Sequence, residues 1–137
     1  MIFFIYLYLF LYIYIFENMK LHTRLDHITS EKEFKEVINN NENVMICCGR
    51  MGPMCLPVYK AMEDLKDTYT NVTFFDMAFD HPDARVIREL PECKGFMGLP
   101  FTVYFKNGKV VAATTSIQSK EQVKSVLDNN VVNVATS

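Results

Sequence analysis

The stretch that decides the fold reads Gly98-Leu99-Pro100-Phe101-Thr102-Val103-Tyr104-Phe105-Lys106-Asn107-Gly108-Lys109. Its apolar run, residues 101–105, is followed by a polar segment, residues 106–109, and then by a second run, residues 110–114. An Asn-Gly pair between two such runs favours a tight hairpin, because both turn residues adopt a positive φ. The sequence therefore predicts two antiparallel strands that are joined at the Asn-Gly pair and entered through the proline.

Strand and helix patterns alternate upstream and downstream of this hairpin. Residues 44–48 and 72–77 are nearly continuous apolar runs, as buried central strands are. Capping boxes that begin at Ser30 and Ser119 predict two helices, and a segment from Met54 to about Tyr69 keeps one face apolar. A short helix is expected over residues 81–91, and a first strand at residues 22–25. This order predicts an α/β fold with a mixed sheet and helices on both faces.

Composition excludes several classes of function. The 137 residues are the length of one domain, and a net charge of −2 provides no basic excess for binding phosphates, so we expect no nucleic-acid partner. The spacing of Cys47, Cys48 and Cys55 does not match the paired ligands of a structural zinc site, so no metal and no cofactor are expected. The three histidines show no catalytic spacing and are predicted to be surface or capping residues.

Two segments resemble the thioredoxin family: residues 98–109, and the sequence Met51-Gly52-Pro53-Met54-Cys55 after the first long strand. The resemblance covers roughly residues 25–129 and implies a four- or five-stranded sheet flanked by four helices. It also implies an active-site loop, residues 50–54, that lies at the start of the second helix and opposite a cis-proline, Pro100. Thioredoxins carry Cys-Gly-Pro-Cys in this loop, whereas here both cysteine positions are methionines.

Other positions depart from the family pattern as well. Arg50 stands where the family has a tryptophan, so the loop comprises Arg50, Met51, Gly52, Pro53 and Met54. The buried aspartate of the preceding family strand has no evident counterpart, because residues 45–47 occupy that neighbourhood.

The four cysteines offer a displaced set of thiols. Amides and the dipole at a helix N-terminus lower the pKa of a thiol, so Cys55 is the predicted nucleophile, with Arg50 nearby to favour the thiolate. Cys48, brought close by the glycines of the loop, or Cys93 is the predicted resolving thiol. The alternative for each cysteine is a buried apolar filler, and this applies most to Cys47.

Two functional hypotheses follow from these residues. The first is a thioredoxin-like thiol–disulfide oxidoreductase of cell redox homeostasis, which acts on protein disulfides and receives electrons from a thioredoxin reductase. The second is a redox-inactive binding module that holds a peptide-like partner in the groove around Leu99 and Pro100.

Residues 1–18 form an apolar leader that precedes the thioredoxin-like domain, residues 19–137. A secretory signal is disfavoured, because no basic residue precedes the apolar run and no small-x-small cleavage site follows it. The run is shorter than the roughly 20 residues of a spanning helix, and its alternation of Tyr, Leu and Ile favours a strand. Two readings stay open: a start site at Met19, or a single-pass membrane anchor.

Lys20 and Arg24 follow the apolar run directly, which for an anchor would keep the domain on the cytoplasmic side. Both readings predict a cytoplasmic domain, where persistent disulfides are not expected.

Overall fold

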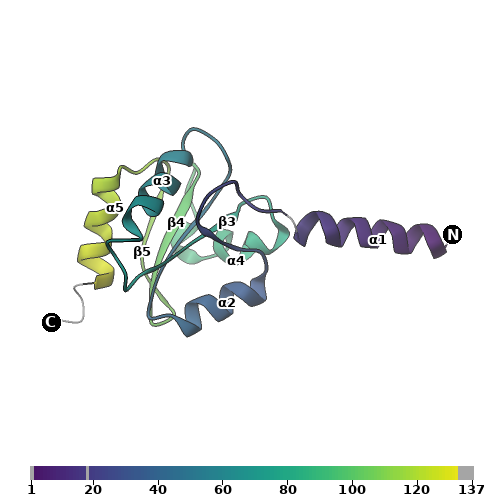
Figure 1. Ribbon diagram of the computed structural model, residues 1–137, viewed down its shortest axis with the longest axis horizontal. Coiled ribbons are helices and arrows are strands. Elements are labelled where there is room, and N and C mark those ends of the chain that lie inside the picture. The colour runs from purple at the N-terminus through teal and green to yellow at the C-terminus, as the bar shows by residue number, and fades with distance from the viewer. Residues whose placement is uncertain (1, 18, 133–137) are drawn as a thin grey trace.

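A five-stranded sheet forms the centre of the fold in the computed structural model, which describes residues 2–17 and 19–132 (Figure 1). The strands are β1 (Asp26–Ile28), β2 (Asn43–Gly49), β3 (Thr73–Ala78), β4 (Phe101–Lys106) and β5 (Lys109–Thr115). Their order is β1-β3-β2-β4-β5, with β1 and β2 parallel to β3, and β4 antiparallel to β2 and β5. The predicted mixed sheet is confirmed.

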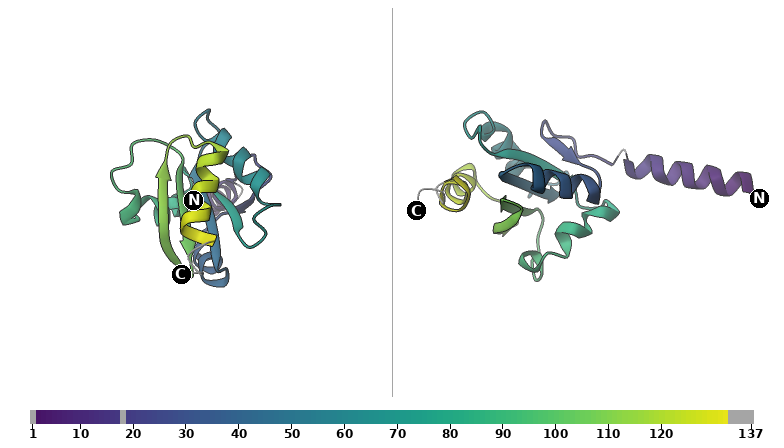
Figure 2. Two further views of the ribbon diagram at one scale, coloured as in Figure 1. Left: turned by 90° about the vertical axis from the view of Figure 1, so that its left-hand side faces the viewer. Right: turned by 90° about the horizontal axis from the view of Figure 1, so that it is seen from below.

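Helices cover both faces of this sheet (Figure 2). The α-helices of the domain are α2 (Glu31–Asn40), α3 (Leu56–Leu65), α4 (Arg85–Arg88) and α5 (Lys120–Val126). Shorter helical segments are η1 (Pro82–Ala84), η2 (Pro91–Cys93) and the π-helical η3 (Leu127–Val132). Side chains of α3 and α5 share one buried cluster, and those of α2 and α4 share the other. The two clusters lie on opposite faces of the sheet.

The central strand β2 is buried along its whole length. Because successive side chains of a strand point to opposite faces, Met45 and Cys47 enter the cluster under α3, whereas Val44, Ile46 and Cys48 enter the cluster under α2. Adjacent cysteines in the sequence are therefore separated by the sheet.

The structure confirms the predicted hairpin turn and the predicted capping residues of two helices. In the hairpin turn, Asn107 has a φ of 52° and Gly108 a φ of 79°. Ser119 and Gln122 form the complete capping box of α5. At α2, Ser30 accepts from the Glu33 N–H at 3.0 Å, but the Glu33 carboxylate accepts from Thr29, one residue before the predicted partner.

Two predicted boundaries are wrong. The first strand is Asp26–Ile28 and not residues 22–25, because the preceding segment turns toward α3, where the Arg24 N–H donates to the Glu63 carboxylate at 2.6 Å. Helix α3 spans Leu56–Leu65 and not residues 54–69. Pro57 is tolerated in the first turn of a helix but not deeper, which places the start of α3 immediately before it.

The leader is helical, with α1 spanning Ile2–Glu17, so the expectation of a strand is wrong. A lone strand would leave its backbone N–H and C=O groups unpaired, whereas a helix pairs them internally. Figure 1 shows α1 extending away from the sheet. Across residues 2–17 and 19–132, no helix combines the length and the apolar character needed to cross a membrane.

The Tyr104→Phe variant tests the packing under α3. Tyr104 pairs with Met45 across β4 and β2, and its buried hydroxyl has no hydrogen-bond partner among the described residues. Since an unsatisfied buried hydroxyl is costly, we expect the variant to unfold at equal or higher denaturant concentration, with a gain of up to about 1 kcal/mol. Chemical denaturation measures this, and a clear loss of stability would contradict it.

Candidate functional site

The segment between β2 and α3 is a tight turn that leads directly into the helix. The N–H groups of Cys55 and Leu56 both donate to the Gly52 carbonyl at 3.0 Å. Met51 and Met54 are exposed, at 39% and 45% of their surface. The two positions at which thioredoxins carry cysteine therefore present thioethers to solvent, and a thioether cannot form a disulfide.

Gly49 is the point at which the loop, α3 and the proline segment meet. The Leu99–Pro100 peptide bond is cis. A Cβ atom at Gly49 would lie 2.7 Å from the Tyr59 hydroxyl, 2.9 Å from Cys55 Sγ and 3.0 Å from Pro100 Cβ. The Tyr59 hydroxyl donates to the Arg50 carbonyl at 3.0 Å and so ties α3 to the loop. Only the absence of a side chain at this position allows these groups to converge.

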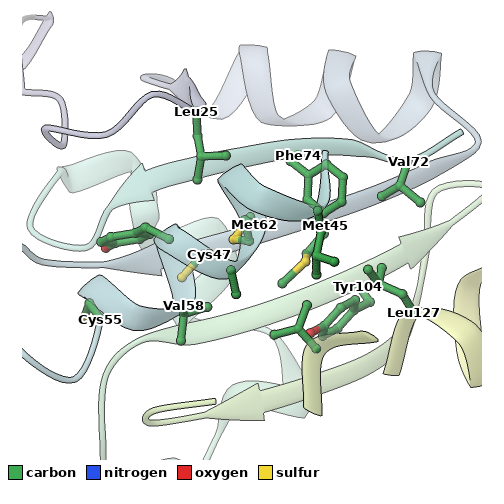
Figure 3. Packing of buried hydrophobic residues seen from close by; sticks show 14 of the residues in the cluster. Leu25, Met45, Cys47, Cys55, Val58, Met62, Val72, Phe74, Tyr104 and Leu127 are labelled. Atoms are coloured by element: carbon green, nitrogen blue, oxygen red, sulfur yellow. The ribbon is translucent and has the colours of Figure 1, made fainter. Parts of the chain in front are cut away.

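Cys55 lies at the N-cap position of α3, as the sequence argument placed it, but its thiol is not presented to solvent. The residue is 2% exposed and belongs to the cluster that also holds Cys47 (Figure 3). An N-cap side chain accepts from the first helical amides when its backbone is extended. Cys55 instead has φ −93° and ψ −37°, and its side chain makes no cap hydrogen bond.

Cys48 and Cys93 belong to the opposite cluster, under α2 and α4. They are 0% and 3% exposed. Burial raises the pKa of the Cys48 thiol well above its usual range and that of Cys93 to about 11. The structure thus groups Cys47 with Cys55 and Cys48 with Cys93, and the expected approach of Cys48 to Cys55 is not found.

Arg50 forms a salt bridge with a carboxylate and a cation–π contact with an aromatic ring. Its Nε and Nη2 atoms donate to the Asp80 carboxylate at 2.8 and 2.7 Å, and its guanidinium lies 5.2 Å from the centre of the Phe79 ring. This hydrogen bonding lowers the pKa of Asp80. Arg50 therefore forms its direct contacts with this carboxylate and ring, whereas the sequence argument assigned its charge to Cys55.

A partly apolar cavity of about 260 Å³ opens beside Pro100. We call it the Pro100 groove; its lining residues are Arg50, Phe79, Phe96, Met97, Gly98, Leu99 and Phe101. Met97 is 98% exposed at its edge. The Ser116 N–H donates to the Pro100 carbonyl at 3.1 Å, and the Thr115 hydroxyl donates to the Gly98 carbonyl. Between these anchors, the Leu99 backbone has no hydrogen-bond partner among residues 2–17 and 19–132.

A buried acid that sequence reasoning missed lies on β3. Asp76 is fully buried, accepts from the Thr23 hydroxyl and lies 2.6 Å from His27 Nδ1. Burial raises its pKa, although both partners act to lower it. The surface-or-cap prediction is wrong for His27 but confirmed for His81, which caps η1. The available signal was one charged residue within the apolar run 72–77.

The Asp76 network lies on the α3 face of the sheet, since Asp76 pairs in register with Cys47. Within the described part of the chain, no group of three or more His, Cys, Asp or Glu side chains is arranged to hold a metal ion.

Comparisons with models of protein families and with curated proteins found no match. Solved structures do match. A thioredoxin from Plasmodium falciparum is 23% identical over 76% of this chain and 97% of its own, with a TM-score of 0.64. Mitochondrial thioredoxin 3 from Saccharomyces cerevisiae is 21% identical over 76% and 94%, with a TM-score of 0.63. A mutant thioredoxin from Halobacterium salinarum is 18% identical over 80% and 92%, with a TM-score of 0.66. At these identities the likeness is one of fold.

Proposed function

Because the chain has a thioredoxin-like fold but carries methionines at the two cysteine positions of the family loop, we propose that it is a binding module for an extended peptide. The main support for this proposal is the difference in exposure between the cysteines and the groove. Every cysteine side chain is buried, whereas the Pro100 groove opens to solvent. A site that excludes its thiols from a partner but offers that partner an apolar surface favours binding over disulfide exchange.

The groove suits recognition by strand addition. The backbone of Leu99 offers a donor and an acceptor to an extended segment, and adjacent Phe96 and Met97 offer apolar contact to one of its side chains. Arg50 lines the same groove, so a polar or acidic neighbour in the partner would find a cation at the rim.

The oxidoreductase hypothesis is the second candidate, and the position of Cys55 supports it. Its Sγ is close to Gly49, on which Pro100 also converges, and it is placed at the start of α3. In this mechanism the Cys55 thiolate attacks a substrate disulfide and releases one substrate thiolate. Cys48 or Cys93 then displaces the substrate and leaves a protein disulfide for a reductase to reduce. Both resolving thiols lie in the other cluster, so the reaction requires the site to open.

Thiol reactivity separates the two candidates. We expect all four cysteines to react slowly with iodoacetamide in the native protein and rapidly in denaturant, as assigned by mass spectrometry, because each is buried. Reduction of a protein disulfide by dithiothreitol should be no faster with the protein than without it, and Cys55→Ser should leave this unchanged.

The Met51→Cys/Met54→Cys variant is the matched gain-of-function test, because it restores the loop cysteines of the family. We expect it to accelerate the same reduction at least tenfold. Rapid native alkylation of Cys55 together with turnover abolished by Cys55→Ser would support the oxidoreductase and contradict the binding module.

Groove binding is tested with peptides selected from a random displayed library on the Cys55→Ser protein. We expect Phe96→Asp to weaken the selected peptides more than tenfold by calorimetry, because it charges the apolar lining of the groove. Lys32→Asp is the control, since Lys32 is exposed on α2 and does not line the groove. Equal affinity for both variants would place binding elsewhere.

A further inference from the structure

Helix α1 has no polar face along its described side chains. Residues 2–15 are exclusively Ile, Phe, Tyr and Leu, and each is between 45% and 72% exposed. A helix that packs on a protein core carries a single apolar stripe, with polar residues on the opposite side. The whole circumference of α1 therefore needs an apolar environment.

The domain does not provide that environment, because α1 extends away from the sheet and its helices (Figure 1 and the right view of Figure 2). A second protein helix would cover one stripe and leave the rest in water, whereas the hydrocarbon of a bilayer surrounds a helix on every side. We propose that α1 inserts into a lipid bilayer and attaches the domain to the membrane surface.

Length and charge define the depth of insertion. The sixteen described residues of α1, which rise by about 1.5 Å each, form a helix of about 24 Å that does not itself reach across the roughly 30 Å of hydrocarbon. The first cations, Lys20 and Arg24, are exposed just after the helix, where they meet the lipid headgroups. The domain then stays on the side from which α1 enters.

Vesicle flotation tests the attachment. The full chain is synthesised in a cell-free system with phosphatidylcholine vesicles, and the fraction that floats with them is measured. We expect the chain to float, and Leu9→Lys, which places a charge in the middle of α1, to lower the bound-to-free ratio at least tenfold. Ile117→Lys is the matched control, because it charges an exposed apolar residue of the domain, and it should float like the parent.

A single fluorophore reports the depth. The chain has no tryptophan, so Leu9→Trp introduces the only one. We expect blue-shifted emission that lipids brominated on their acyl chains quench strongly.

The proposal is overturned if the full chain forms oligomers that do not float, if Leu9→Lys floats as well as the parent, or if the acyl-chain bromines fail to quench. None of these outcomes depends on the Pro100 groove, so this proposal and the proposed function fail separately.

Discussion

Replacing Gly49 with alanine is expected to destabilise the domain by about 3 kcal/mol, at the upper end for overpacking in a core. The added Cβ would be 2.7 Å from the Tyr59 hydroxyl, 2.9 Å from Cys55 Sγ and 3.0 Å from Pro100 Cβ. These atoms belong to α3 with its N-cap residue and to the proline segment, both of which are packed, so relief requires one of these segments or β2 to move. We expect the midpoint of urea denaturation to fall with little change in slope.

Gly52→Ala is the matched control within the same loop. No heavy atom would lie within 4 Å of a Cβ at Gly52, and its stability should change by no more than about 0.5 kcal/mol. Peptide binding should follow the same pattern, with a loss for Gly49→Ala and none for Gly52→Ala. Equal stability of the two variants would show that α3 and the proline segment do not converge on Gly49.

Removing the Asp76 carboxylate is the second change with a large expected effect. Asp76→Ala leaves the Thr23 hydroxyl and the His27 ring, both partly buried, without their acceptor. The loss of a buried hydrogen-bonding group with its partners retained costs about 1–3 kcal/mol. Asp76→Leu/His27→Leu should recover part of this, because both members of the pair are then apolar.

The effect of Asp76→Ala should depend on pH. Burial raises the pKa of Asp76 in the folded chain above that of the unfolded chain, which is about 3.9. The folded state therefore binds the proton more tightly, and the contribution of Asp76 to stability is fully present below about pH 4. This contribution falls as the pH rises through the pKa of the folded state and is constant at higher pH. The difference in unfolding free energy between the parent and Asp76→Ala should therefore become smaller as the pH rises.

Asp80→Ala provides the comparison for an exposed acid. The side chains of Asp80 and Arg50 are 54% and 55% exposed, so water and salt screen their ion pair and its loss should cost at most about 1 kcal/mol. Because Arg50 lowers the pKa of Asp80, this contribution is present above the unfolded pKa and is lost as pH falls. An Asp76→Ala effect that grew with rising pH would contradict the burial argument.

The elements whose signals are local were the predictable part of this fold. Asn107 and Gly108 form the turn between β4 and β5 because few residues accept the positive φ that the turn requires. Ser119 caps α5 because its side chain reaches an amide only three residues away. The predicted start of β1 was wrong because β1 pairs with β3, which lies almost fifty residues later in the sequence. A pairing partner so far away in the sequence leaves no local pattern.

In the candidate site, too, some features were predictable from the sequence and others were decided only by the tertiary structure. The residues alone predicted the loop with two methionines and its position at the start of a helix, and the resemblance to the thioredoxin family implied that it lies opposite Pro100. Only the packed structure decided that Cys55 is buried, that Cys48 faces the opposite side of the sheet, and that Asp76 has His27 as a partner. Exposure and side-chain contact depend on which surfaces meet when distant segments pack, and sequence spacing does not encode this.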